Sequence, residues 1–242
     1  MKIECAGTGS TGNCYILTDK KGNQCVLDCG VSYKKLLKAD LINDRPDLAL
    51  VTHKHKDHSG HIKDFTDCGI PVFVPMQVKL DGYASSYLVD ALMRDKEGRY
   101  AKEAVETWQF FPFRIDHEKN VENVGYIVYS SVNDEGVVYI TDASSISYGS
   151  VTLNKKPLSE FIIEVNYDDE TLERNVKKTG DQNLYRQAKR HMSLKKAVRW
   201  LSLQDLSGCS SIHVCHMSDR NCNEEKVKRT LKERFGKEII IF

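Results

Sequence analysis

Residues 52–58 read Thr-His-Lys-His-Lys-Asp-His, and they directly follow an aliphatic run at residues 47–51 that predicts a buried strand. The turn after this strand carries three imidazoles and a carboxylate, which belong to His53, His55, Asp57 and His58. One histidine in such a loop would be typical of a solvated surface, whereas four donors this close together favour a divalent metal, with zinc the first choice and manganese a further candidate. Four donors also exceed what one open catalytic zinc takes from a single segment, which indicates two metals.

The pattern Thr-His-x-His-x-Asp-His after a strand resembles the signature of the metallo-β-lactamase-fold hydrolases. The resemblance implies that His53 and His55 hold the first metal. It likewise implies that Asp57 and His58 hold the second, and Asp57 is counted among the catalytic residues as well. Because the di-iron flavoprotein branch of the family has Glu in place of His55, this site is expected to be hydrolytic rather than redox.

The same resemblance implies three further ligands at later strand ends. The sequence offers His117 for the first metal, His216 for the second and Asp142 as a bridge between them. Asp142 ends the apolar run at residues 136–140, where an unpaired buried carboxylate would cost several kcal/mol or more, so it needs a partner such as a metal pair. Two such metals can share a bridging hydroxide at neutral pH, since zinc lowers the pKa of bound water to about 7.

Two segments nearer the N-terminus are also expected to lie at the site. Asp28 follows an apolar run at residues 24–27, and in the family an Asp here orients a ligand imidazole, although a helix-capping role fits the sequence equally well. Residues 6–13 contain three glycines, but neither a helical pattern nor Gly-Lys-Ser/Thr follows them, so a tight hairpin loop is favoured over a phosphate cradle. Their Gly-Ser-Thr-Gly-Asn wording resembles the YycJ/WalJ-like nuclease branch.

Composition places the chain among ordinary globular proteins. Its 242 residues are 40% hydrophobic and carry a formal net charge of +1, which argues against a general polyanion binder. No basic and apolar leader and no run long enough to span a bilayer occurs, so a cytoplasmic protein without membrane contact is expected. The eight cysteines are expected to be reduced, because such a chain needs no disulfide staples.

Hydrophobic patterning predicts one α/β domain over residues 1–242, an αββα sandwich of two packed mixed sheets flanked by helices, as the resemblance also implies. The predicted strands cover residues 1–5, 14–18, 24–27, 47–51, 71–74, 108–115, 125–130, 136–140, 161–163, 212–215 and 237–242. The predicted helices cover residues 33–41, 59–67, 76–100, 194–206 and 224–235. His61 is expected on a helix surface, and residues 76–100 are expected to form a lid or a homodimer contact.

Residues 174–199 carry nine Lys and Arg residues against the single acid Asp181. Such a run is usually a solvated helical face, but this one surrounds His191-Met192-Ser193. The RNase Z, PhnP and YycJ-like branches have a similar His-x-Ser segment, with Gly where this chain has Arg190. The resemblance implies that His191 protonates the leaving oxygen, steadied by Glu164.

Since phosphodiester cleavage needs an acid for its alkoxide more than thioester cleavage does, this segment favours a phosphodiesterase. Within the basic run, Arg190, Lys195 and Lys196 are the residues expected to contact substrate phosphate. The leading hypothesis is therefore a dinuclear metal hydrolase that cleaves nucleic acid or a small or cyclic nucleotide. An acyl hydrolase for thioesters or lactones is the alternative, and a binding module with a degenerate site is the third hypothesis.

Overall fold

The computed structural model describes residues 1–147, 149–153, 156 and 158–242, and its strands form two sheets of six and seven strands. The first sheet has the order β1 (Lys2–Gly7), β2 (Cys14–Thr18), β3 (Gln24–Leu27), β4 (Leu48–Leu50), β5 (Val72–Val74), β6 (Val89–Ala91). The second has the order β13 (Glu238–Ile241), β12 (Ser211–Cys215), β11 (Leu158–Glu164), β10 (Glu135–Ile140), β9 (Asn123–Ser130), β8 (Trp108–Ile115), β7 (Glu103–Val105).

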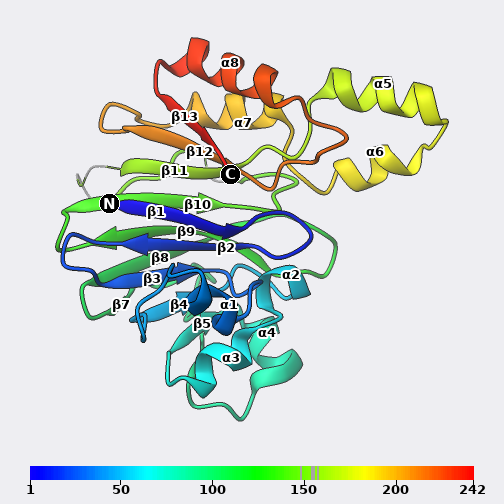
Figure 1. Cartoon of the computed structure of the whole chain (residues 1–242). Helices are drawn as coiled ribbons and strands as arrows, with labels where there is room; N and C mark the ends of the chain where they lie inside the picture. The colour runs from blue at the N-terminus through cyan, green and yellow to red at the C-terminus, as the bar shows by residue number, and fades with distance from the viewer. Residues whose placement is uncertain (148, 154–155, 157) are drawn as a thin grey trace.

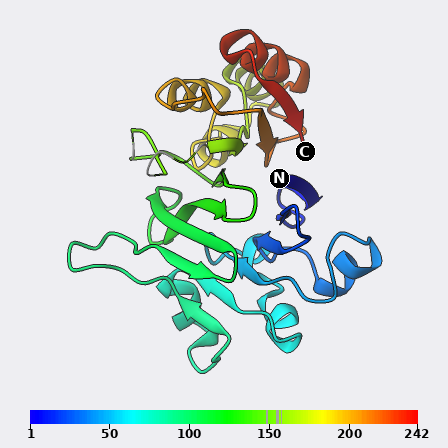
Figure 2. The ribbon, with the colours of Figure 1, turned by 90° about the vertical axis from the view of Figure 1, so that its left-hand side faces the viewer.

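The two sheets pack face to face because alternate residues of their strands point to opposite faces. In β2, Tyr15 and Leu17 join the core between the sheets, whereas Cys14 and Ile16 face the helices outside. The outer face of the first sheet is covered by α1 (Tyr33–Lys38) and α3 (Ile62–Asp67). The second is covered by α7 (Leu194–Leu201) and α8 (Glu224–Phe235), so the predicted αββα sandwich is confirmed (Figures 1 and 2).

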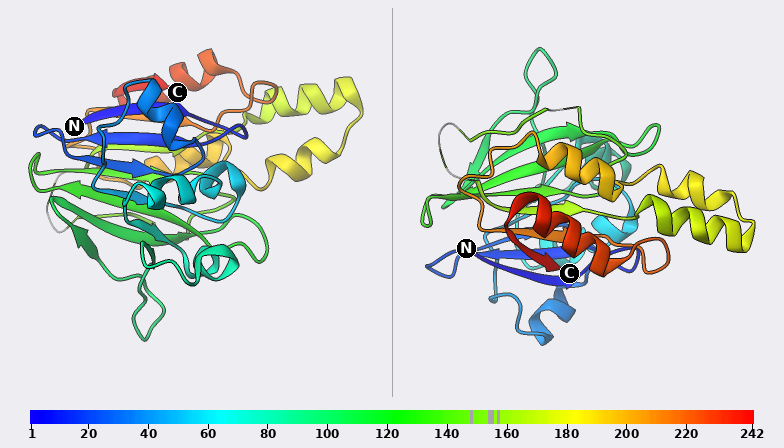
Figure 3. Two further views of the ribbon diagram at one scale, coloured as in Figure 1. Left: turned by 60° about the horizontal axis from the view of Figure 1, so that its bottom comes forward. Right: turned by 90° about the horizontal axis from the view of Figure 1, so that it is seen from above.

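Two helices leave this sandwich. α5 (Asp169–Thr179) and α6 (Asn183–Ala188) form a hairpin, here called the helical arm, that projects beside the sheets in both views of Figure 3. Its own small core contains Leu172, Val176 and Ala188. Asp168 caps α5 at its start, and Gly180 ends it in the left-handed conformation (φ 72°). The Asp and Gly signals made α5 predictable, although it was not predicted, whereas α6 begins without a side-chain cap.

One predicted helix is wrong. Residues 76–100 form only the short α4 (Met76–Val78) and a π-helical turn (Lys79–Tyr83) before the chain turns extended. β6 then pairs with β5 in parallel, and Arg94 bridges to Tyr100. Sheet extension has overridden the helical spacing of the aromatic residues here. The predicted helix at residues 59–67 is divided into α2 (Lys56–Ser59) and α3, and the other predicted strands and helices are confirmed to within a few residues.

Strand direction explains where a site can form. β3, β4 and β5 run parallel, as do β10, β11 and β12, and β8 shares their direction because both it and β10 are antiparallel to β9. In open α/β sheets, ligand sites form beyond the carboxyl ends of such strands. The predicted site residues follow these ends.

Candidate metal centre

The seven predicted metal ligands converge at the carboxyl ends of the strands. The ligand atoms of His53, His55, His117 and Asp142 lie within 4.8 Å of one another. A second group with the same spacing consists of Asp57, His58 and His216. Two ligand sets of this composition suit divalent ions of the zinc type. The fold and this cluster therefore indicate a divalent metal site.

Asp142 lies between the two groups. Its Oδ2 atom is 3.2 Å from His53 Nε2 and 3.3 Å from His58 Nε2. Its Oδ1 atom is 3.2 Å from His216 Nε2. One carboxylate thus contacts imidazoles of both groups, as a shared ligand would.

Unpaired buried atoms test whether the residues fit a metal. His53 Nε2, Asp142 Oδ1 and His216 Nε2 are buried, and although contacts of 3.2 Å join them to neighbouring groups, none makes a hydrogen bond of good geometry in the described part of the chain. Leaving such an atom unsatisfied costs about 1–3 kcal/mol. All three face one another in the cluster, where cations would satisfy them, so the donor set fits a metal.

The backbone at three strand ends is held in an unusual conformation. Asp28, Asp142 and His216 have φ values of 62°, 50° and 53°. This left-handed region is uncommon outside glycine, although Asp and His tolerate it better than most residues. The turn points the side chains of Asp142 and His216 into the cluster directly after β10 and β12.

The N-terminal loop fixes the position of α2. The N–H of Asn13 donates to the Asp57 carbonyl over 2.7 Å, and the N–H of Cys29 donates to the His58 carbonyl over 2.7 Å. Gly30 allows this approach, because a Cβ atom there would lie 1.8 Å from the Asp57 carbonyl oxygen. Residues 6–13 therefore form a loop at the site, as predicted, with backbone contacts to α2.

Hydrogen bonds on the far side of two imidazole rings determine which ring nitrogen faces the cluster. Asp28 Oδ2 accepts a hydrogen bond from His58 Nδ1 over 2.7 Å and another from the Tyr139 hydroxyl over 2.6 Å. The carbonyl of Arg190 accepts from His117 Nδ1 over 3.0 Å. These contacts leave Nε2 of both histidines as the atom available to a metal.

His191 lies at the rim of the cluster, and Glu164 holds it. Its Nδ1 is 2.7 Å from Glu164 Oε1 and 3.4 Å from Asp142 Oδ1, and its side chain is 20% exposed. Glu164 is fully buried, and its Oε2 accepts from the N–H groups of Ala143 and Met192. The donors of Asp142, Glu164, His191 and His216 also lie within 4.8 Å of one another, so a metal position there is a geometric alternative.

Ser193, the last residue of the His-x-Ser segment, caps α7. Its hydroxyl accepts from the N–H of Lys196 over 3.2 Å. This cap fixes the start of the helix at Leu194, three residues after His191. The sequence pattern thus places a histidine at a defined distance from a helix N-terminus.

Burial and charge determine the protonation of the cluster. Burial lowers the pKa of His53 to about 4. Burial also opposes protonation of His58, but without a bound cation the carboxylates of Asp28 and Asp142 outweigh it and raise its pKa to about 10, so a metal ion at Nε2 would displace a proton. For Asp142 burial favours the neutral acid, yet His216 and His58 hold its pKa well below the ordinary value. The Asp142 carboxylate is therefore ionised at neutral pH, in the form that binds a cation.

The three predicted phosphate contacts have different surroundings. Arg190 Nη1 pairs with Glu118 Oε1 over 2.8 Å. Lys196 Nζ donates to the Ser144 carbonyl over 2.7 Å, which ties α7 to the loop after Asp142. Lys195 is exposed at the start of α7.

Sequence reasoning missed two asparagines at the cluster. Asn13 is fully buried, and its Nδ2 atom lies 2.9 Å from His58 Nε2. Asn166 Nδ2 donates to the His216 carbonyl over 2.9 Å and lies 3.3 Å from the Nδ1 atom of His216. Asn13 ends the Gly-Ser-Thr-Gly-Asn wording, but that resemblance gave it no role at the cluster, and no local signal marked Asn166 after β11. His61, by contrast, lies outside the cluster with a side chain 41% exposed.

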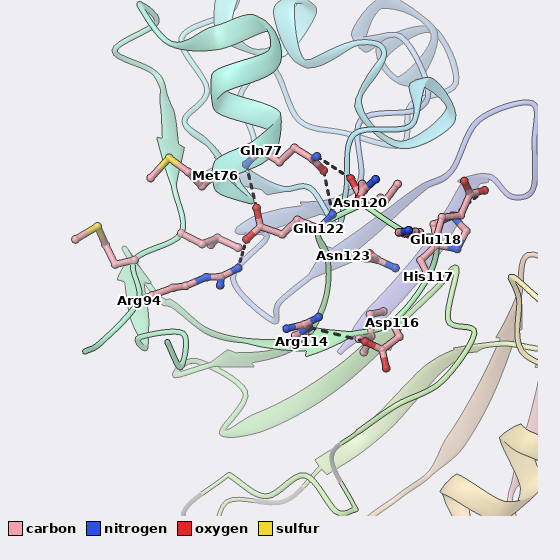
Figure 4. A pocket seen from close by; sticks show the side chains of 15 residues that line it. Met76, Gln77, Arg94, Arg114, Asp116, His117, Glu118, Asn120, Glu122 and Asn123 are labelled. Atoms are coloured by element: carbon pink, nitrogen blue, oxygen red, sulfur yellow. Dashed lines mark hydrogen bonds and ion pairs between the residues drawn. The ribbon is translucent and has the colours of Figure 1, made fainter. Parts of the chain in front are cut away.

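A cleft of about 1090 Å³ adjoins the cluster on the His117 side. Figure 4 shows His117 and Asn123 at one end and Arg94 at the other, with Gln77 and Glu122 between them. The cleft lies beside the metal ligands, since His117 is the one ligand that lines it. The cleft is therefore an open space that adjoins the cluster.

Several solved structures share this fold. The metallo-β-lactamase-fold protein YhfI from Bacillus subtilis superposes with a TM-score of 0.66 at 14% identity, over 99% of this chain and 95% of that one. The short form of human tRNase Z gives 0.63 at 17% identity, over 91% and 94% of the two chains. A diphosphatase of the PhnP family gives 0.63 at 13% identity, over 99% and 94%. At such identities the likeness shows the fold alone, and the diiron β-hydroxylase CmlA shares it as well (TM-score 0.60, 13% identity, over 99% of this chain and 52% of that one).

Sequence comparison decides the family. Comparison with curated proteins finds no significant match. Residues 7–145, more than half of the 242-residue chain, match the family described as the metallo-beta-lactamase superfamily. The matched region contains six of the seven predicted ligands, from His53 to Asp142, and all seven follow the carboxyl ends of strands of the sandwich. The chain belongs to the metallo-β-lactamase superfamily.

Proposed function

We propose that this chain is a dinuclear metal-dependent phosphodiesterase that cleaves nucleic acid or a small or cyclic nucleotide. In this proposal His53, His55 and His117 hold one ion. Asp57, His58 and His216 hold the other, and Asp142 is shared between the two ions. Zinc suits this donor set best, and manganese is compatible with it.

The observation that carries the proposal is the pairing of His191 with Glu164 beside the cluster. Glu164 accepts the Nδ1 proton of His191, so the Nε2 atom can carry the proton that a leaving alkoxide needs. Glu164 also accepts two backbone N–H groups, which fixes its carboxylate in place. It is thus a positioning residue, and a partly exposed imidazole at the rim meets the geometric demand on a general acid.

Each residue has a distinct task in this reaction. Two divalent ions would supply an activated water and neutralise phosphate charge. Asp57, whose side chain is 25% exposed, is the cluster carboxylate that can accept a hydrogen bond from the attacking water. Asp28 and the Arg190 carbonyl keep two ligand imidazoles oriented, and His191 gives its proton to the leaving oxygen.

Cations that flank His191 in the sequence support a phosphate-bearing substrate. The helical arm carries exposed Arg174, Lys177, Lys178 and Arg186, and Lys195 and Lys196 stand at the start of α7. A polyanion could follow this surface away from the cluster, with each phosphate contact making binding more salt-dependent. The solved folds of tRNase Z and the PhnP-family diphosphatase agree with a phosphate-directed reaction.

An activity screen tests the proposal. Protein reconstituted with zinc or manganese would be assayed against bis-p-nitrophenyl phosphate, single- and double-stranded nucleic acids, cyclic mononucleotides and an acyl thioester. We expect turnover of at least one phosphodiester, abolished in Asp142→Asn, where the shared ligand loses its charge. Turnover of the thioester alone would instead establish an acyl hydrolase.

A further inference from the structure

The cleft beside His117 has no task in the proposed chemistry. We infer that this cleft binds an uncharged nucleoside portion of the substrate, next to the scissile phosphate. The inference rests on the proposed phosphodiesterase function and specifies its substrate. It follows from the position of the cleft, the balance of its charges and its methionine walls.

The cleft lies directly beside the metal cluster. The cleft and the metal cluster share His117, whose Nε2 atom is 3.3 Å from His55 Nδ1 and 3.7 Å from Asp142 Oδ2. Asn123, at the same end, donates to the Asp142 carbonyl over 2.9 Å. A group attached to a phosphate at the cluster would therefore adjoin the cleft. The volume of about 1090 Å³ lies just above the usual range for ligand pockets, about 300–1,000 Å³, so the cleft has room for a nucleoside.

Charge balance argues against phosphate in the cleft. Arg94 pairs with Glu122 and lies over the Tyr100 ring, 4.5 Å from its centroid. Arg114 faces Asp116 over 3.8 Å. Both guanidinium groups thus have carboxylate partners. The remaining lining cation, Lys119, is matched in number by Glu118, so the lining has no net positive charge to hold a phosphate. Phosphates are better accommodated by the helical arm and α7, on the other side of His191.

The walls suit a flat ring. Met76 and Met93 line the cleft with exposed fractions of 46% and 62%, beside the buried Leu92. Thioethers adapt their shape to a ligand and make favourable contacts with aromatic rings, each of about 0.3–1.5 kcal/mol. Asn120, exposed at the lip, offers an amide to the polar edge of a base. Apolar walls with an amide edge and no net charge match a nucleoside.

The cleft is held open by a reciprocal pair of contacts (Figure 4). The N–H of Gln77 donates to Glu122 Oε2 over 2.9 Å, and the N–H of Glu122 donates to Gln77 Oε1 over 2.9 Å. Gln77 Nε2 also donates to the Asn120 carbonyl over 2.9 Å. α4 is thereby fixed to the loop that carries His117. A preformed cleft binds a rigid ring at a lower ordering cost than a loop that must fold around it.

Two substrates with the same leaving group test the inference. Thymidine 5′-(p-nitrophenyl) phosphate and methyl p-nitrophenyl phosphate differ only in the nucleoside. We expect the ratio of their kcat/KM values to fall about tenfold in Met76→Ala/Met93→Ala, in keeping with two lost ring contacts. Leu203→Ala, which truncates an exposed leucine outside the cleft, serves as the matched control and should keep the wild-type ratio. An unchanged ratio in the double variant would overturn the inference.

A binding measurement separates failure of the cleft from failure of the proposed function. In protein labelled at its five methionine methyl groups, thymidine should shift the signals of Met76 and Met93, whereas Met1 and Met192 should stay in place. Ribose 5-phosphate should leave Met76 and Met93 unshifted. If thymidine does not shift the methyl signals of Met76 and Met93, the nucleoside site is refuted even in an active phosphodiesterase. If thymidine shifts these methyl signals but the protein hydrolyses neither ester, the nucleoside site is supported and the proposed function is refuted.

Discussion

His191 is the residue on which the choice of reaction depends. Positioned general acids contribute about 10²- to 10⁴-fold, so His191→Ala should lower kcat on a natural phosphodiester by that factor. The loss should shrink on bis-p-nitrophenyl phosphate, because nitrophenolate leaves without a proton. Bound metal, measured on the same samples, should stay at the wild-type level.

The control for this variant is His61→Ala, which removes an exposed histidine paired with Asp64 outside the cluster. It should retain full turnover on both substrates. Equal losses on the two esters, or lost metal in His191→Ala, would make His191 a binding residue or a metal ligand. The geometric group of His191 with Asp142 and Glu164 would then be the second metal position.

At this scale the sequence was most informative where residues act in one short segment. Metal binding by residues 52–58 could be predicted because four donors follow one strand. Asp142 and His216 could be named only through the resemblance, since a single Asp or His at a strand end has many uses. Asn13 was beyond reach, because its contact with His58 joins residues 45 positions apart.

Among the elements, α7 carries the most direct test of phosphate binding. Lys195→Glu/Lys196→Glu should raise KM more for a polymer than for a mononucleotide. It should also reduce the salt slope of polymer binding by up to about two units, since each phosphate contact contributes about 0.9. Lys228→Glu/Lys232→Glu makes the same charge change on exposed positions of α8 and should leave the slope at its wild-type value. Unchanged KM and slope for every phosphodiester in the α7 variant would make these lysines a solvated face.

The helical arm depends on Asp168, which is 1% exposed. Its carboxylate accepts from the N–H of Thr171 at the start of α5, from the N–H of Asn223 and from Lys226 Nζ over 2.9 Å. Burial alone would raise the pKa of Asp168, but hydrogen bonds from Lys226 and Thr171 outweigh it and lower the pKa. A lowered acid pKa stabilises the fold at every pH above the unfolded value of about 3.9, and that stability is lost as pH falls below it.

Asp168→Asn should therefore lower the free energy of unfolding at pH 7 by about 1–3 kcal/mol, through a weakened cap and a lost ion pair. Urea unfolding should give the same difference at pH 5 and a smaller one at pH 3. Asp67→Asn, which breaks the exposed pair with Lys63, should change the free energy of unfolding by less than about 1 kcal/mol. A difference that persists at pH 3 would show that the carboxylate charge is not what stabilises the arm.

The elements also show how far local patterns can predict a fold. β4, β8 and β10 were predictable because each is a continuous or alternating apolar run. Residues 76–100 were not, because β6 is stabilised by pairing with β5 rather than by its own composition. In this segment, pairing with the free edge of β5 determined the backbone conformation more strongly than the helical spacing of the aromatic residues did.

For the whole molecule, metal binding should be linked to stability, because a preformed site of buried donors exists only in the folded chain. Saturating zinc should raise the Tm of metal-stripped protein. The rise should be smaller in Asp142→Asn, a change that suits the positive φ of 50° at this position. An equal rise in both proteins would place the bound metal outside the cluster.

No helix in the described part of the chain is long and apolar enough to cross a membrane.

Stepwise reconstitution of metal-stripped protein tests the dinuclear phosphodiesterase most directly. Bound metal and hydrolysis of bis-p-nitrophenyl phosphate would be measured in the same samples as zinc or manganese is added. We expect turnover to rise with the second equivalent and to level off at two ions per chain. Saturation at one ion, or two bound ions without any turnover of the diester, would contradict the account.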